Sequence, residues 1–414
     1  MKRLIWLTIC SLSLMLVGCE DMMEIEKQAY VIAVGVDQTD QEGKYQFTFQ
    51  ISNPDVGAGS EGTNRKLVHE TISIPSSDLI TAVDIANDFV TKKINLDHTR
   101  VLLISEELAK TGDFIRIVQP SSRTTQMRRS IQLIVTKEKA ETFLRNASPK
   151  LEQKPHKYFQ YMITRANETG VIPDADFHRF FQITEGGKDL FLAIYATTIQ
   201  EEENLNKPSI EKIAGELIQS GGNPAQFMGA AVFKNGKMID ILNGQETRIT
   251  NVLDKTKNMN NILSSFPDPV DPTYNISGYI IQKVNPTIDI QYDHEKEHAS
   301  IDIFVPLDFE IVAIPSMVHF SESNELINLL TKSFEEHYQS ITTELIKKTQ
   351  QEYQGDPFYW SIFVRKLFKD IPSYEEANWC EEIYPDADIN VSVELERLEF
   401  GKSLYDTNID RDSD

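Results

Sequence analysis

Cysteine is scarce in this chain of 414 residues, which contains three: Cys10, Cys19 and Cys380. Two of them lie in the first nineteen residues, in a segment that we interpret below as a leader ending at a modified cysteine. Cys380 is then left without an intrachain partner, so no disulfide is expected and stability must come from packing. We interpret Cys380, beside Trp379, as a small core residue and not as a nucleophile.

Positive charge is also in short supply. The chain has 41 lysines and arginines against 63 aspartates and glutamates, a formal net charge of −22 at pH 7. Such an acidic protein is not expected to bind nucleic acid through the phosphate backbone. Anionic lipid head groups repel it as well, so any attachment to a bilayer must come from something other than a basic patch.

Long apolar runs are absent too. Residues 4–17 form a run without charge that follows Lys2 and Arg3. This run is too short for a bilayer-spanning helix, which needs roughly 20 apolar residues. A basic start, a short apolar stretch and small residues before a cut site describe a secretory signal peptide. We therefore expect residues 1–18 to be a signal peptide.

The end of this leader, Leu16-Val17-Gly18-Cys19, resembles the lipobox of bacterial lipoproteins. The resemblance implies a diacylglycerol thioether on Cys19 with acyl chains such as palmitate, cleavage before Cys19, and retention on the outer face of a membrane. Two acyl chains suffice for stable anchoring, whereas one is marginal. A plain cleaved signal would not need Cys19, and a membrane anchor would not turn acidic at Glu20 and Asp21.

Signatures of catalysis are missing or out of context. No G-x-S-x-G sequence occurs, and Gly186-Gly187-Lys188 lacks the rest of a phosphate loop. Gly57, Gly59 and Gly62 fit G-x-G-x-x-G, but the next segment has the pattern of a strand. Without a helix N-terminus there is no row of free N–H groups to hold a pyrophosphate. These residues predict no enzyme and no cofactor apart from the covalent lipid.

The sequence His294-Glu-Lys-Glu-His298 fits H-E-x-x-H. In zinc peptidases both histidines lie on one helix face and the glutamate polarises water. Here five polar residues separate two alternating runs, which favours a hairpin loop between strands. Metal binding by His294 and His298 stays open as an alternative.

Residues 19–222 show alternating strand and helix patterns, which predict a mixed α/β region and leave open a division into two subdomains. Strands are expected over residues 29–37, 45–51, 67–74, 98–105, 130–136, 191–199 and 210–218, and helices over residues 77–90, 106–110, 137–146, 157–166 and 176–183.

Residues 220–224, Ser-Gly-Gly-Asn-Pro, break this pattern and predict a domain boundary. Beyond it, Asn235-Gly236 predicts a hairpin, and Asn243 with Glu246 predicts a capping box. The C-terminal domain, residues 223–402, is expected to be α+β and rich in strands, with one long helix, and an acidic tail follows over residues 403–414. Strands are expected over residues 274–284, 287–292, 299–313 and 389–395, and helices from Ser323 to Gly355 and over residues 358–369.

Taken in order, these segments resemble one family, the Ger(x)C lipoproteins, which are the C subunits of bacterial spore germinant receptors. The resemblance rests on the lipobox and four later segments. Glu20-Asp21 departs from it, because many members have Trp-Asp after the cysteine. The segments are residues 26–37, which end in Gly-Val-Asp, residues 228–246, which contain the Ala-Val-Phe hairpin and Leu-Asn-Gly-Gln-Glu, residues 355–358, and the closing segment from Trp379 to Gly401.

The resemblance implies a non-catalytic subunit that is lipid-anchored at the outer face of the cell or spore inner membrane. Its expected partners are the integral membrane A and B subunits of a receptor that senses nutrients and triggers germination of the spores that sporulation produces. A solute-binding lipoprotein of an importer is the alternative from another class, since it also combines a lipobox with α/β lobes. A zinc peptidase built on His294 and His298 is the remaining alternative.

Overall fold

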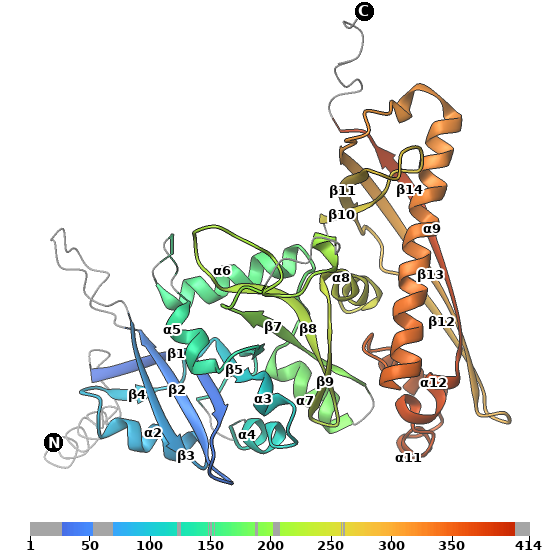
Figure 1. Ribbon diagram of the computed structural model, residues 1–414. Coiled ribbons are helices and arrows are strands. Elements are labelled where there is room, and N and C mark those ends of the chain that lie inside the picture. The colour runs from blue at the N-terminus through green and yellow to red at the C-terminus, as the bar shows by residue number, and fades with distance from the viewer. Residues whose placement is uncertain are drawn as a thin grey trace, which may run out of the picture.

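The computed structural model describes residues 27–401, apart from residues 53–68, 122–125, 148, 150, 153, 187–188, 202–207, 258 and 260. It contains a nine-stranded sheet with helices packed around it and a five-stranded sheet against which one long helix lies (Figure 1). The leader, Cys19, the Gly57–Gly62 segment and the acidic tail predicted over residues 403–414 lie outside the described residues.

The nine-stranded sheet has a parallel centre and antiparallel edges. Its order is β3-β2-β1-β5-β6-β7-β8-β9, and β4 pairs with the beginning of β1. Strands β1, β5, β6 and β7 run parallel to one another, and hairpins extend the sheet on both sides. The strands are β1 (Gln28–Gln38), β2 (Tyr45–Ser52), β3 (His69–Ser76), β4 (Lys93–Asn95), β5 (Val101–Ser105), β6 (Gln132–Thr136), β7 (Phe191–Thr197), β8 (Gln226–Lys234) and β9 (Lys237–Leu242).

The helices of this first part are short and join successive strands, as the alternating pattern predicts. They are α2 (Leu79–Asn87), α3 (Glu106–Ala109), α4 (Phe114–Ser121), α5 (Ala140–Asn146), α6 (Pro155–Glu168), α7 (Phe177–Gly186) and α8 (Gly244–Leu253).

Glycine in β1 explains how closely a helix approaches the sheet. A Cβ atom at Gly35 would lie 3.0 Å from the Cβ of Ala140 and 3.1 Å from Cδ1 of Leu144, both in α5. Two residues later, Asp37 accepts hydrogen bonds from the N–H groups of Ala140 (2.6 Å) and Glu141 (3.0 Å) at the start of that helix. The Gly-Val-Asp ending of the first strand therefore seats and caps α5.

The five-stranded sheet has the order β10-β11-β13-β12, with β14 on the other edge of β13. The pairs are antiparallel except β13 with β14, which is parallel. A parallel pair needs a long crossover, and the segment that contains the long helix supplies it. The strands are β10 (Ile262–Pro267), β11 (Asn275–Ile281), β12 (Thr287–Asp293), β13 (His298–Ala313) and β14 (Asp388–Glu399).

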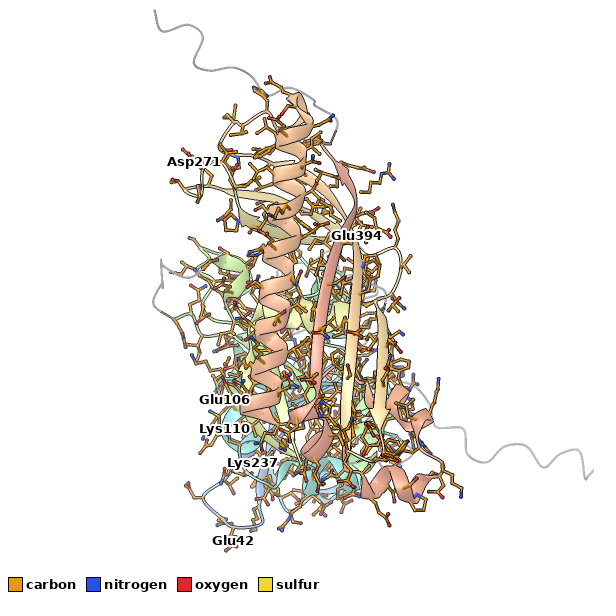
Figure 2. All side chains as sticks on the ribbon, turned by 90° about the vertical axis from the view of Figure 1, so that its right-hand side faces the viewer. Glu42, Glu106, Lys110, Lys237, Asp271 and Glu394 are labelled. Atoms are coloured by element: carbon orange, nitrogen blue, oxygen red, sulfur yellow. The ribbon has the colours of Figure 1, made fainter. Side chains whose placement is uncertain are left out.

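The long helix, α9 (Asn324–Lys348), begins at its predicted N-cap, since the Ser323 hydroxyl accepts the N–H of Leu326. It packs on the sheet through Leu330, Phe334 and Leu345, which are buried. Figure 2 shows it lying alongside β14, on which Glu394 is labelled, and the N–H of Leu395 in that strand donates to Glu335 of the helix at 2.9 Å. The short helices α10 (Ser361–Val364), α11 (Ile371–Glu376) and α12 (Tyr384–Asp386) follow.

The predicted fold class is confirmed: a mixed α/β part precedes a strand-rich part with one long helix. Some element predictions are wrong. Residues 210–218 form a 3₁₀ turn (Ser209–Glu211) and loops, not a strand, and residues 358–369 do not form one helix. The patterns also missed β4, α4 and β10.

Strands β7 and β8 separate two hydrophobic cores. Phe191 and Ala193 face the core of the nine-stranded sheet, whereas Leu190 and Leu192 belong to the core under α9. In β8, Ala231 belongs to the core of the nine-stranded sheet and Ala230 belongs to the core under α9. Both strands are therefore buried on both faces. The predicted boundary at residues 220–224 stays a prediction; it falls between these two strands, which pair in one sheet.

Candidate functional site

The junction of the two cores brings together several buried polar side chains, and we take it as the candidate site. It forms where the turn after α9 meets the start of β7. The N–H of Leu190 donates to the backbone oxygen of Asp356 at 2.9 Å. A Cβ atom at Gly355 would lie 2.8 Å from Leu190 side-chain carbons, so glycine allows this contact.

The Asp356 carboxylate organises that turn. It accepts the N–H groups of Phe358 (2.7 Å) and Trp360 (2.9 Å) and the indole Nε1–H of Trp379 (3.3 Å). Asp356 is fully buried. Burial raises the pKa of Asp356 to about 6, although these hydrogen bonds favour the charged form.

A second carboxyl group, Asp189, lies next to Asp356. Asp189 accepts a short hydrogen bond from the Ser361 hydroxyl, and its Oδ1 is 3.8 Å from Sγ of Cys380. Burial, followed by the charge of Asp356, raises the pKa of Asp189 well above its usual range. Two neighbouring carboxyl groups in a low-dielectric site do not both ionise readily, so the pair holds a proton near neutral pH.

Cys380 is a buried thiol in this cluster, as the sequence predicted for a core residue. Burial and then the charges of Asp189 and Asp356 raise the pKa of Cys380 well above its usual range. The nucleophilic form of cysteine is the thiolate, so a thiol held neutral in this way is unreactive.

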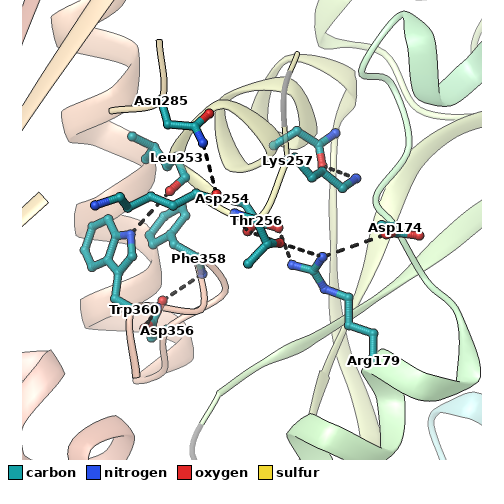
Figure 3. A network of polar contacts seen from close by, with 12 residues as sticks. Asp174, Arg179, Leu253, Asp254, Thr256, Lys257, Asn285, Asp356, Phe358 and Trp360 are labelled. Atoms are coloured by element: carbon teal, nitrogen blue, oxygen red, sulfur yellow. Dashed lines mark hydrogen bonds and ion pairs between the residues drawn. The ribbon is translucent and has the colours of Figure 1, made fainter. Parts of the chain in front are cut away.

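Arg179 of α7 connects the first part of the chain to this junction (Figure 3). Its guanidinium lies over the ring of Tyr359, with 3.6 Å from Cζ to the ring centroid, and it donates a short hydrogen bond to Asp254. Asp254 also accepts the Thr256 hydroxyl at 2.6 Å. On the other side of Asp254, Trp360 Nε1 reaches the backbone oxygen of Leu253 at 3.5 Å. This network fixes the end of α8 between the two parts.

Lys257, in the same close-up, donates to Oδ1 of Asn251 at 3.0 Å. Burial lowers the pKa of Lys257 to about 8. Asn251 in turn donates to the backbone oxygens of Gly170 and Ile172, each at 3.0 Å. This lysine therefore belongs to the hydrogen-bonded network that holds α8 against the loop after α6.

A cleft of about 550 Å³ opens beside the carboxyl pair, between α7 and the α10–α11 segment. Tyr359, whose ring lies under the Arg179 guanidinium, lines it. The lining side chains carry both charges and hydroxyl groups: Gln182, Asp189, Tyr359, Ser361, Arg365, Lys366, Tyr374 and Glu375.

The carboxyl pair makes stability at the junction depend on pH. A raised pKa in the folded state means that the folded chain binds more protons than the unfolded chain above about pH 4, so stability falls as pH rises through about 6. Asp189→Asn mimics the protonated side chain. We expect the free energy of unfolding of the variant, measured relative to that of wild type, to rise by about 1–3 kcal/mol between pH 4.5 and pH 7.5.

Urea unfolding at several pH values measures this shift. The exposed Asp289 on β12 gives the matched control Asp289→Asn, which makes the same chemical change outside the buried junction. Asp37, whose pKa burial also raises, contributes the same slope to every variant and cancels in the comparison. If the free energies of unfolding of wild type and Asp189→Asn changed with pH in parallel, the carboxyl pair would not share a proton.

The carboxyl ends of the parallel strands, where α/β folds usually bind ligands, are filled by the chain's own side chains. Asp37 caps α5, as described above. Glu138, after β6, accepts the Thr197 hydroxyl and the Thr198 N–H at the end of β7, at 2.5 and 2.7 Å. Glu106, after β5, accepts the Tyr195 hydroxyl at 2.6 Å. These three carboxylates at the strand ends are therefore engaged in contacts within the fold.

His294 and His298 lie at the turn between β12 and β13, so the predicted hairpin loop is confirmed. The His298 ring contacts the Asp388 carboxylate at 3.0 Å from Nε2. The His294 ring packs against Tyr292 and Phe368, with centroid distances of 4.7 and 5.4 Å. The helix face that the zinc motif requires is not formed. Within the described ranges, no group of three histidine, cysteine, aspartate or glutamate side chains is placed to hold a metal ion.

Sequence reasoning did not find the junction. Its one local signal is Gly355-Asp356-Pro357, which the sequence analysis used as the end of the long helix and, together with Phe358, as a segment of the family resemblance. Cys19 lies outside the described residues, so the lipid site stays a prediction. None of the helices in the described part of the chain has both the length and the apolar character of a bilayer-crossing segment.

Comparison with known families gives two consecutive matches. Residues 21–197 match the family described as "Spore germination protein N-terminal domain". Residues 228–401 match the family described as "Spore germination B3/ GerAC like, C-terminal". The 30 residues between the matches contain the predicted boundary at residues 220–224.

Two curated proteins are matched over nearly their whole length. The chain is 22% identical to spore germination protein B3 of Bacillus subtilis (strain 168) over 402 residues, 94% of this chain and 95% of that protein. It is also 22% identical to spore germination protein GerQC of Bacillus cereus over 404 residues, 97% of this chain and 99% of that protein. The crystal structure of the GerBC protein has the same fold, with a TM-score of 0.52 and 16% identity, over 90% of this chain and 99% of that one.

Proposed function

Because the chain belongs to the GerAC-like family of spore germination proteins, we propose that it is the lipid-anchored, non-catalytic subunit of a germinant receptor. The match over both consecutive domains carries this proposal. The Leu16-Val17-Gly18-Cys19 leader adds the anchor: a diacylglycerol on Cys19 holds the mature chain at the outer face of the spore inner membrane. The integral membrane A and B subunits are its partners there.

The chemistry of the junction supports a non-catalytic role. The Cys380 thiol is kept neutral by burial, and Asp189 and Asp356 are engaged in holding a turn. The strand ends at which an α/β enzyme would bind substrate are occupied by Asp37 and Glu138. The proposal therefore assigns this subunit to assembly and not to turnover.

Lipid anchoring gives assembly a physical advantage. Tethering this subunit in the same bilayer as its partners turns association into a local encounter at high effective concentration. The anchor is necessary because the chain is acidic, with a net charge of −22, and anionic lipids repel it. The outer face of the second sheet carries exposed Asp289, Asp302 and Glu394, which suits partner surfaces rich in lysine and arginine.

Cys19→Ala tests the proposal. The variant is expected to leave the membrane fraction of spores, to lose co-purification with two integral membrane proteins, and to reduce the germination response to nutrients several-fold. Cys380→Ala, checked for folding by its urea midpoint because Cys380 is buried, is the comparison that removes a cysteine and keeps the lipid site. A normal response from a soluble Cys19→Ala protein would refute the anchoring role, and purification with a transport ATPase would favour the importer alternative.

A further inference from the structure

The five-stranded sheet has one covered edge and one open edge. At the covered edge, α9 lies alongside β14, and Glu335 of the helix accepts the N–H of Leu395 at 2.9 Å (Figure 2). At the open edge, β12 pairs with β13 on one side and with no other strand of the described residues on its other side. An unpaired edge offers a row of backbone N–H and C=O groups to an incoming strand.

Strand β12 lacks most of the features by which proteins protect such an edge from other chains. Thr287–Asp293 is seven residues long, contains neither proline nor lysine, and pairs with β13 without a bulge. Its inner face is anchored, because Ile290 is buried and the Tyr292 ring packs against Phe368 at a centroid distance of 5.1 Å. The protection that remains is the negative charge of its exposed aspartates.

Two carboxylates face each other on the outer face of the sheet beside this edge. Asp289 of β12 lies directly opposite Asp302 of β13 in the strand register, and both residues are exposed. Like charges in that position destabilise a sheet. Asp302 accepts the side-chain amide of Asn390 in β14 at 3.0 Å, and Asp289 accepts that of Gln291 at 3.3 Å. These neutral amides leave both negative charges uncompensated.

The basic side chains of the second sheet do not relieve this repulsion. The lysines and the arginine on its strands and turns are paired with other carboxylates: Lys283 with Asp308, Lys296 with Asp293, and Arg397 with Glu399. The His298 ring contacts Asp388 in the same way. Within the part of the chain that the structure describes, none of these cations forms an ion pair with Asp289 or Asp302. The pair therefore favours a cation from another molecule.

We propose that β12 is the docking edge for an extended segment of a partner protein in which lysine or arginine alternates with aliphatic residues. Such a segment adds a strand to the sheet through main-chain hydrogen bonds. Side chains opposite each other on neighbouring strands have Cβ atoms about 4.5–5.5 Å apart, so a basic residue opposite Asp289 forms an ion pair and extends toward Asp302. The aliphatic residues of the segment cover Ile288 and Tyr292, which are half-buried.

This inference rests on the proposed function and deepens it, since it assigns the surface through which the subunit meets a protein partner. A strand edge is satisfied by backbone groups, which a polypeptide supplies and a lipid head group does not. A second copy of this chain is disfavoured, because pairing two β12 edges would bring their aspartates together. The charge on β12 therefore selects a basic partner and discourages self-association.

The test uses a fluorescent peptide, acetyl-Thr-Lys-Val-Lys-Val-Lys-Thr-amide, titrated with the full-length protein in detergent at physiological ionic strength. The anisotropy of the peptide is expected to rise to saturation of a single site. Asp289→Asn combined with Asp302→Asn should weaken binding by about threefold to thirtyfold, the effect of losing two cross-strand charge pairs. The urea midpoint of this double variant should stay equal or rise, because the change also removes the repulsion between the two aspartates.

Two N-methylated peptides distinguish strand addition from simple charge attraction. One carries the methyl groups on its valine amides and the other on its lysine amides, which point to opposite edges of an extended peptide. One of the two is expected to lose binding and the other to keep it. Equal affinities for the two would overturn the strand edge, and equal binding of a peptide with glutamate in place of lysine would overturn the role of charge.

The matched control is Asp40→Asn combined with Glu42→Gln, which removes the same charge from the exposed turn before β2 (Figure 2, where Glu42 is labelled). This control should bind the peptide as wild type does. An equal loss of affinity in both double variants would show a response to net charge alone and would overturn the proposal. The assay needs neither Cys19 nor a membrane. If it fails while the wild-type chain still co-purifies with two integral membrane proteins, the docking edge is refuted and the receptor assignment stands.

Discussion

Asp356→Ala is expected to lower the free energy of unfolding by about 3–6 kcal/mol, because it leaves three buried N–H donors without their acceptor. Those donors are the backbone N–H groups of Phe358 and Trp360 and the indole of Trp379. The loss is a large fraction of the 5–15 kcal/mol by which a typical domain is stable. Trp360 and Trp379, two of the three tryptophans of the chain, both lie at this junction, so tryptophan fluorescence reports on it.

Urea unfolding followed by that fluorescence gives the measurement. Asp356→Asn should fall between alanine and wild type, since an amide oxygen still accepts but the charge is lost. Asp289→Ala, on the exposed face of β12, should change stability by less than about 0.5 kcal/mol. If Asp356→Ala unfolded within 1 kcal/mol of wild type, the turn would be held by the packing of Phe358 and Trp360 and not by the carboxylate.

The elements that could be predicted from the sequence are those whose signals are local. Asn235 and Gly236 take φ values of +50° and +75°, the geometry that a two-residue hairpin turn requires and that these residue types tolerate. Asn243 and Glu246 form the reciprocal capping box, with hydrogen bonds of 2.9 and 2.8 Å. In these places a few neighbouring residues decide the backbone, so the sequence alone is sufficient.

The segment after α9 shows why other predictions failed. Residues 358–369 have the composition of a helix, yet Tyr359 adopts a φ of +63°, which no helix contains. The Asp356 carboxylate holds that conformation by accepting the N–H groups on either side of Tyr359, and the Tyr359 ring lies under Arg179. Tertiary contacts here outweigh helix propensity, which is a weak preference of less than about 1 kcal/mol per residue.

The candidate site could not be predicted from the sequence, for a related reason. Ser361 and Asp189, which share a hydrogen bond, are 172 residues apart in the sequence. A single aspartate among 63 acidic residues carries no sign that it will be buried. The parallel pairing of β14 with β13 is likewise non-local, because it depends on where the crossover through α9 returns the chain.

Arg179→Met is expected to cost about 3 kcal/mol, because it removes one partner of a buried ion pair and leaves Asp254 with its charge. The side chains of Arg179 and Asp254 are 13% and 4% exposed. The cost lies at the lower end for such pairs because Thr256 continues to donate to Asp254 through its N–H and its hydroxyl. Methionine keeps part of the apolar stem of Arg179 and removes the guanidinium, with its ion pair to Asp254 and its contact over the Tyr359 ring.

A double-mutant cycle separates the pair from its surroundings. Asp254→Asn alone should also destabilise, and the double variant should lose less than the sum, with a coupling free energy of about 1–3 kcal/mol. The control pair is Arg145 with Glu141 on α5, at 2.9 Å but with side chains 51% and 31% exposed, for which the coupling should stay near 0.5 kcal/mol or below.

The size of that coupling decides how the two parts of the chain are joined. A coupling of about 1 kcal/mol or more means that Arg179 of α7 and Asp254 at the end of α8 form a specific polar link, reinforced by Tyr359 from the turn after α9. Coupling no larger than in the control pair would mean that this ion pair adds little, and that the apolar faces of β7 and β8 and the hydrogen bonds of Asp356 and Asp189 hold the parts together.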